Sequence, residues 1–332
     1  MEISPVAREA EQLALFNSGV DLARLRSLGE RLQTGPQPAP LTARNYAADW
    51  RMFASWCVRC GRSALPASDD TVWLYVTFML VERNNKSFTA TRHVSSILYH
   101  HRVANLPVPD IDKVRSLLAD VRRARRERYE GKRALTPRDL GRILKSCDVG
   151  TNVGLRDRAM LVLGFATSMR RSELVGLDLS DITFEENKGL VVLLRRSKTD
   201  QAGRGRLIAV WPGSNPATDP VVILRSWIDR RGNWAGPLFT NCGGFGDRIR
   251  RGRLDGEVVN KALKRCLVRI GLDPLQYGAH SLRAGAVTAA AQQGRSDQEI
   301  MALSGHKSAV MMTQYVRRAR VFDGRNPLAG VL

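Results

Sequence analysis

The segment Gly278-Ala-His-Ser-Leu-Arg-Ala-Gly-Ala-Val-Thr-Ala-Ala-Ala291 places one histidine and one arginine among small apolar residues. Its periodicity predicts a helix over 281–293. His280 and Arg283 stand three residues apart, which is about one helical turn, so both side chains share a face. Their small neighbours are typical of a packed helix. We therefore expect this polar pair to be directed into the protein.

Further polar residues precede and follow this helix. Arg170-Arg-Ser-Glu173 lies near the end of a predicted helix over 156–176, where the three-residue spacing places Arg170 and Glu173 on one face. Lys198 lies at the tip of a predicted hairpin between the β-rich runs 190–194 and 206–211. His306 follows Ser304-Gly305, and Tyr315 follows nine residues later. Taken singly, each has an ordinary structural explanation, such as an ion pair, a core histidine or a packed tyrosine.

Together these residues contain the parts that metal-free cleavage of a phosphodiester requires. Two arginines neutralise the non-bridging oxygens with planar, permanently charged donors. Tyr315 supplies a hydroxyl nucleophile. With an unperturbed pKa of about 10 the hydroxyl is a weak nucleophile, and nearby cations and a histidine would activate it. Lys198 supplies a proton for the leaving oxygen. We expect neither a cofactor nor a metal, because the Cys57/Cys60 pair lacks the further ligands that zinc needs.

In order and spacing, this pattern resembles the tyrosine recombinase (phage integrase) family: an arginine, a hairpin lysine, His-x-x-Arg, Gly-His and then the tyrosine. Trp50-Arg-Met-Phe-Ala-Ser-Trp-Cys57 and Ser197-Lys-Thr199 are similar to the simple, Cre-like members. The resemblance covers roughly residues 41–332. It implies a site-specific recombinase that cuts and rejoins DNA through a 3′-phosphotyrosine intermediate and a Holliday junction, without metal or ATP.

The resemblance also implies roles for the phosphate-binding residues. Arg170 and Arg283 would clamp the scissile phosphate, and Glu173 would hold Arg170 or its surroundings in place. His306 would hydrogen-bond the phosphate or support the site. Arg171 is a competing arginine, and Ser168-Met169 stands where many relatives have a glycine. We assign the role to Arg170 because it precedes Glu173 by three residues.

The same resemblance assigns the chemical steps. Tyr315 would attack the phosphorus, Lys198 would protonate the departing 5′-oxygen, and His280 would assist proton transfer at the nucleophile. A type IB topoisomerase, which uses a similar set of residues on one duplex, is an alternative. A non-catalytic DNA-binding regulator on the same fold is another.

The chain before this catalytic region has its own helical pattern. A leader over 1–40, which we expect to be flexible, ends in a proline-rich stretch, and helical periods follow over 41–121. A basic linker over 122–133 precedes a helix that begins at Thr136-Pro137. We therefore expect a mainly helical chain with a small antiparallel sheet. By resemblance it would be a C-shaped clamp, with a helical core-binding domain of the SAM-like type and a catalytic domain over 134–332.

Composition predicts the partner of such a clamp. The 332 residues include 52 Lys and Arg against 32 Asp and Glu, a formal net charge of +20, and a basic folded surface favours a polyanion. Six of these net charges fall in residues 1–132 and fourteen in residues 133–332. The charge is therefore spread over both domains. Candidate DNA contacts, by the resemblance, are Thr42, Arg44, Arg51, Thr89, Arg92, Lys261 and Lys264.

The resemblance extends to assembly. It implies double-stranded DNA with inverted repeats as partner, a dimer on each site and a homotetramer on two sites. The apolar tail from Val321 to Leu332 would dock on a neighbouring protomer, or by the simpler interpretation on its own domain. No apolar run reaches the roughly 18 residues of a membrane span. We expect a cytoplasmic, nucleoid-associated protein of bacterial, phage or plasmid origin.

Overall fold

The computed structural model describes residues 38–127, 131–195, 205–243 and 248–306, together with 308, 312 and 316. The chain divides into two compact units between Tyr129 and Glu130. The main hydrophobic core of one unit shares no residue with that of the other.

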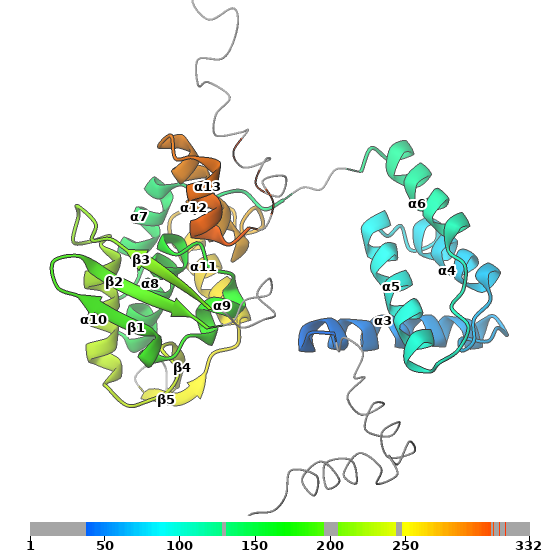
Figure 1. Cartoon of the computed structure of the whole chain (residues 1–332), viewed down its shortest axis with the longest axis horizontal. Coiled ribbons are helices and arrows are strands. Elements are labelled where there is room, and N and C mark those ends of the chain that lie inside the picture. Colours follow the sequence, from blue (N-terminus) through cyan, green and yellow to red (C-terminus); the bar gives the residue numbers. More distant parts are fainter. Residues whose placement is uncertain are drawn as a thin grey trace, which may run out of the picture. The chain divides into compact units, whose positions relative to one another are not determined.

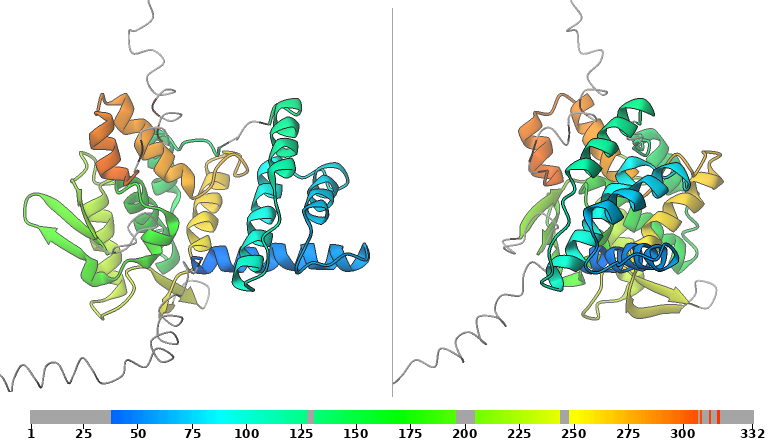
Figure 2. Two further views of the ribbon diagram at one scale, coloured as in Figure 1. Left: turned by 45° about the vertical axis from the view of Figure 1, so that its right-hand side comes forward. Right: turned by 90° about the vertical axis from the view of Figure 1, so that its right-hand side faces the viewer.

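The first unit is helical. It contains α3 (Pro40–Arg59), α4 (Asp69–Val81), α5 (Ser87–Val103) and α6 (Asp112–Ala124). In Figures 1 and 2, α3 runs crosswise to α5, against which it packs. Phe53 and Tyr75 are fully or nearly buried at the centre of its core. Helix α6 includes Arg122 and Arg123, which the sequence places in the linker.

The second unit combines helices with two small sheets (Figure 1). Its helices are α7 (Pro137–Ser146), α8 (Asn152–Ala166), α9 (Arg171–Gly176), the 3₁₀ turn η1 (Leu179–Asp181), α10 (Pro220–Arg231), α11 (Glu257–Arg269), α12 (His280–Gln292) and α13 (Asp297–Ser304). Thr136 caps α7 as predicted, because its side chain accepts a hydrogen bond from the Asp139 N–H. The prediction of a mainly helical chain with a small antiparallel sheet is confirmed, and a second small sheet is present in addition.

The larger sheet contains the predicted hairpin and one strand that the sequence pattern does not reveal. Strand β2 (Gly189–Leu194) pairs antiparallel with β1 (Ile182–Glu185) and with β3 (Arg206–Val210). Strand β1 has only four residues and follows a 3₁₀ turn, so its run of alternating residues is too short to be recognised in the sequence. A second pair, β4 (Thr240–Gly243) and β5 (Arg248–Arg253), is also absent from the prediction.

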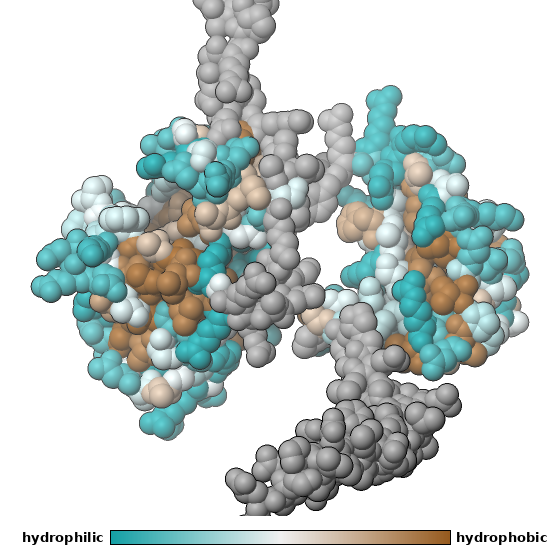
Figure 3. Space-filling view, in the orientation of Figure 1, coloured by the Kyte–Doolittle hydropathy of each residue, from teal (hydrophilic) through white to brown (hydrophobic). Residues whose placement is uncertain are grey.

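The larger sheet buries one face in the core of the unit. Val192 and Ile208 face inward, whereas Leu207 and Trp211 are about 70% exposed. Figure 3 shows an apolar area over this part of the unit. Within the described residues, no helix is both long and apolar enough to cross a membrane.

Candidate active site

Arg170 and Glu173 are joined by a helix cap. The predicted helix over 156–176 is wrong, because the chain leaves α8 after Ala166 and starts α9 at Arg171. Arg170 is the N-cap of α9. The Glu173 carboxylate accepts hydrogen bonds from the Arg170 backbone N–H at 2.8 Å and from its Nη1 at 2.6 Å. The predicted pairing is therefore present, but it arises because Glu173, at the third position of α9, accepts from the N-cap backbone and guanidinium, and not from a shared helical face.

The turn between α8 and α9 links Arg170 to the second arginine. Ser168 has a φ of +53°, in the left-handed region that favours glycine. A glycine, which the resemblance described above leads us to expect near this position, would adopt this conformation without strain. The Ser168 carbonyl accepts a hydrogen bond at 2.7 Å from Nη1 of Arg283, whose side chain is almost fully buried. The turn that carries Arg170 is thus tied to α12.

His306 completes this arrangement from a third segment. Its Nε2 lies 3.2 Å from Nη2 of Arg283, and its Nδ1 lies 2.6 Å from Oγ of Ser304. A guanidinium has no acceptor, so Nε2 must accept the proton of Arg283. It follows that Nδ1 carries the hydrogen of the neutral ring and donates it to Ser304.

The lowered pKa values of His280 and His306 indicate a positive electrostatic potential around both rings. Desolvation and the charges of Arg283 and Arg170 lower the pKa of His306 to about 4. The pKa of His280 is lowered by the same three influences in the same order, although the ring keeps exposed surface. His280 therefore lies in the field of both arginines. Both histidines are neutral at pH 7 in this state.

Arg206, at the start of β3, supports these residues from outside, and sequence reasoning misses it. Its Nη1 donates to the carbonyls of Ala302 and Leu303 at the end of α13, where a cation offsets the helix dipole. Burial lowers its pKa most; Glu173 raises the pKa by a smaller amount, and Arg170 lowers it further. It fixes the turn that leads to His306. A single arginine in a β-rich run gives no signal of this role.

Close packing positions α12. Gly285 approaches the segment before α7, where an added Cβ would lie 2.1 Å from the Leu135 carbonyl oxygen. The Leu135 N–H also donates to the Ser281 carbonyl at 3.0 Å. Only glycine permits this contact. His280 and Arg283 are thereby held at the N-terminal turn of α12.

Two predicted catalytic residues, Lys198 and Tyr315, lie outside the described residues. Arg171 forms an ion pair with Glu257 of α11 at 2.6 Å. It is Arg170, not Arg171, that contacts Glu173. The structure thus brings Arg170, Glu173, His280, Arg283 and His306 into one neighbourhood, referred to below as the arginine–histidine cluster.

The candidate DNA contacts lie on three helices. Thr42, Arg44 and Arg51 are on α3, Thr89 and Arg92 are on α5, and Lys261 and Lys264 are on α11. Arg44, Arg51, Arg92 and Lys261 are exposed, and the other three are half-buried. Arg92 is also paired with the buried Asp49. All seven keep some accessible surface, and none has a tested role.

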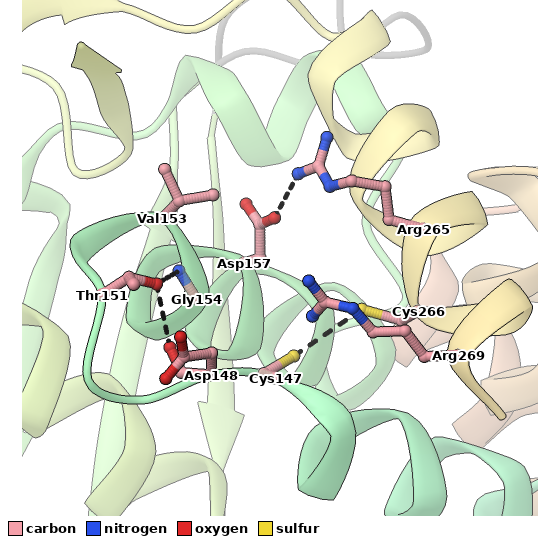
Figure 4. A pocket seen from close by; sticks show the side chains of 9 residues that line it. All are labelled: Cys147, Asp148, Thr151, Val153, Gly154, Asp157, Arg265, Cys266 and Arg269. Atoms are coloured by element: carbon pink, nitrogen blue, oxygen red, sulfur yellow. Dashed lines mark hydrogen bonds and ion pairs between the residues drawn. The ribbon is translucent and has the colours of Figure 1, made fainter. Parts of the chain in front are cut away.

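A pocket of about 240 Å³ lies elsewhere in the second unit (Figure 4). Its lining includes Cys147 and Cys266, whose sulfur atoms are 3.7 Å apart, and the Asp157–Arg265 ion pair. It shares no residue with the arginine–histidine cluster. We therefore do not assign the chemistry to it.

The charges of the cluster are suited to binding an anion. Two guanidinium groups flank it, and the one carboxylate among the cluster's members, Glu173, is engaged by Arg170. The N-terminal turn of α12 adds the favourable end of a helix dipole. Neutral histidines beside it can exchange protons near neutral pH once an anion offsets the arginines.

Comparison with known proteins agrees with this chemistry. Residues 133–320 match the model of the phage integrase family. The chain is 30% identical over 315 residues to the integrase/recombinase XerD homolog of Selenomonas ruminantium, covering 93% of this chain and 91% of the relative. It is 25% identical over 289 residues to the recombinase Cre of Escherichia phage P1, covering 80% and 81%. Likeness to Cre is therefore looser than likeness to the XerD homolog.

The fold is also shared with solved structures. The XerH site-specific recombinase, bound to a palindromic difH substrate in a post-cleavage complex, superposes with a TM-score of 0.60 at 17% identity. That match covers 88% of this chain and 79% of XerH. With the family model matching more than half of the residues, the chain belongs to the phage integrase family of tyrosine recombinases.

Proposed function

We propose that this recombinase cuts and rejoins duplex DNA at specific sites through a 3′-phosphotyrosine bond to Tyr315. The observation that supports it is the convergence of Arg170, Arg283 and His306 from three segments around one positively charged position. The two arginines would bind the non-bridging oxygens and stabilise charge that builds on the phosphate. Both histidines would gain protons more easily with that charge present.

The proposed step is a transfer between two diesters. The Tyr315 oxygen forms a bond to phosphorus and loses its proton, with His280 assisting. The bond from phosphorus to the 5′-oxygen breaks, and Lys198 protonates that oxygen. A 5′-hydroxyl of a partner strand then reverses the step. Since the phosphotyrosyl diester retains the energy of the broken bond, neither ATP nor metal is required.

The proposed assembly follows the family. Dimers would bind inverted repeats, as suggested by the palindromic substrate of XerH. Two bound sites would join in a tetramer and exchange strands through a Holliday junction. The two units would clamp the duplex, with α3, α5 and α11 carrying the contacts and the tail 321–332 docking on a neighbour. The protein would act on the DNA of a bacterium, phage or plasmid.

Covalent trapping tests the nucleophile. Duplexes that the wild-type chain selects from a randomised library would be prepared with a nick near the centre. Cleavage beside the nick then releases a short strand that diffuses away, so the covalent adduct accumulates. In EDTA and without nucleotide, the wild type should form an adduct that survives SDS. Tyr315→Phe should bind the duplex equally well and form no adduct. Adducts in that variant would refute the assignment.

A sulfur substitution tests Lys198. A substrate with sulfur in place of the bridging 5′-oxygen releases a thiolate, whose conjugate acid has a pKa of about 8.5 and needs no proton donor. This substrate should restore cleavage to Lys198→Ala. It should not restore Tyr315→Phe or Arg283→Ala, which serve as matched controls. Failure to restore Lys198→Ala would mean that the lysine has another role.

The products separate the alternatives. A recombinase requires two sites to give exchanged strands. Relaxation of supercoiled DNA by a monomer, with no two-site product, would indicate a topoisomerase. Sequence-specific binding by the wild type without any adduct would indicate a regulator.

A further inference from the structure

The first unit contains a buried carboxylate, Asp49, beside a candidate DNA contact. Asp49 lies on α3 and its side chain is only 3% exposed. Its Oδ2 accepts from Nε of Arg92 at 2.8 Å, and its Oδ1 accepts from Nη2 of Arg92 at 2.8 Å. The Arg92 side chain, on α5, is 49% exposed. One end of this bidentate pair is therefore fixed in the interior and the other reaches solvent.

A second set of contacts holds Asp49 from the inside. Nε2 of His93 lies 3.2 Å from Oδ1 of Asp49, and Nδ1 of His93 lies 3.0 Å from the Tyr75 hydroxyl. Burial lowers the pKa of His93, which favours the neutral ring. With Nε2–H donating to the carboxylate, Nδ1 accepts from Tyr75. All three residues are buried, so the carboxylate has one orientation.

The contacts to Asp49 leave the outer edge of the Arg92 fork for a ligand. A guanidinium has five N–H groups, of which Asp49 engages Nε–H and one on Nη2. The Nη1 and Nη2 edge is the one with which arginine contacts O6 and N7 of guanine. Holding the side chain in advance reduces the rotamer entropy lost on binding. A freely rotating arginine would more readily contact phosphates, which carry no sequence information.

We propose that Asp49 is a positioning residue that makes Arg92 a base-specific contact, with guanine as the preferred partner in the major groove. The proposal rests on the proposed DNA-binding function of the first unit. It assigns Tyr75 and His93 the task of fixing Asp49. It also predicts that loss of the carboxylate weakens sequence preference without weakening overall affinity.

Selection from a randomised 30-base-pair duplex library tests this proposal on the full chain. The wild type should select guanine at one position of each half-site. Arg92→Lys keeps the charge but not the fork, and Asp49→Asn keeps the shape but not the bidentate acceptor. Both should reduce the guanine preference about tenfold at that position and leave the other positions unchanged.

Binding to one mixed-sequence 30-base-pair duplex supplies the second readout. Asp49→Asn should bind it slightly more tightly than the wild type does, because a negative charge is removed. Asp70→Asn is the matched control. Asp70 is paired with Arg62 at 2.7 Å in the same unit, but it is exposed. The control should show the same gain in affinity with no change in base preference.

Unchanged guanine preference in Asp49→Asn would overturn the proposal, as would an equal loss at every position. If Asp49→Asn does not fold, Tyr75→Phe decides, because it removes only the hydroxyl behind His93. It should weaken the guanine preference at the same position, and no change there would refute the network. Failure of adduct formation on the selected duplexes would instead refute the proposed chemistry and leave this result standing.

Discussion

Glu173 is the side chain that fixes the direction of Arg170. It accepts from both the backbone and the guanidinium of that residue while being 4% exposed itself. Glu173→Gln retains the size but loses a charge-assisted bond, so Arg170 should become misaligned. We expect the rate of covalent adduct formation to fall about 10- to 100-fold. Quench-flow assays should show this with DNA affinity unchanged.

The matched control for that variant is Glu257→Gln. Glu257 pairs with Arg171 at the same distance of 2.6 Å, but both side chains are more than 40% exposed. Its adduct formation should equal that of the wild type. A similar loss in both variants would mean that Glu173 has no special role.

Ser168 combines two unfavourable features. Its φ of +53° is costly for a residue with a Cβ, and its buried Oγ has no hydrogen-bond partner in the described structure. Ser168→Gly should raise the free energy of unfolding by about 1 kcal/mol. Ser168→Ala removes only the hydroxyl and should gain less. Urea denaturation checks both, and a loss of stability in the glycine variant would contradict the strain.

His306 should titrate with a pKa of about 4, well below its ordinary value, because of burial and the nearby arginines. At pH 6 we therefore expect the neutral Nδ1–H form, visible in the ¹⁵N NMR shifts of the ring. Adding inorganic phosphate should raise this pKa, since an anion offsets Arg283 and Arg170. The pKa of His93, which is lowered by burial in the other unit, should not respond. No shift of His306 would argue against an anion site.

At the scale of elements, the contact between α12 and the segment before α7 determines where His280 and Arg283 lie. Gly285→Ala should reduce the free energy of unfolding by about 1–3 kcal/mol, because its Cβ would overlap the Leu135 carbonyl. Gly176→Ala is the control, since nothing lies within 4 Å of that Cβ. Chemical denaturation should separate the two. Equal free energies of unfolding for Gly285→Ala and Gly176→Ala would show that α12 can move away from the Leu135 carbonyl.

The elements also show how far sequence reasoning reaches. The cap at Thr136 and the hairpin of β2 and β3 follow local rules of period and hydrogen bonding, so they were predictable. The break between α8 and α9 was not, because the turn at Ser168 depends on Arg283 from a distant helix. Arg206 was missed for the same reason, since its partners are carbonyls of α13. Residue types indicate chemistry, whereas backbone partners appear only in three dimensions.

At the scale of the whole molecule, the described part of each unit has its own main hydrophobic core. Phe53→Ala in the first and Leu161→Ala in the second remove fully buried side chains, at a cost of about 2–5 kcal/mol each. Calorimetry should show two unfolding transitions, with each variant lowering a different one. A single transition that shifts with both substitutions would mean that the units unfold together.

The hydrogen bond from Arg283 to the Ser168 carbonyl affects which substitutions position 168 can tolerate. A main-chain oxygen is present whatever residue occupies the position, so substitution cannot delete the acceptor. Serine can therefore replace glycine at some cost in backbone strain and still leave Arg283 anchored. Family members that share this hydrogen bond should vary freely at this position within the residues that tolerate a positive φ. Arg283, the donor, has no such freedom.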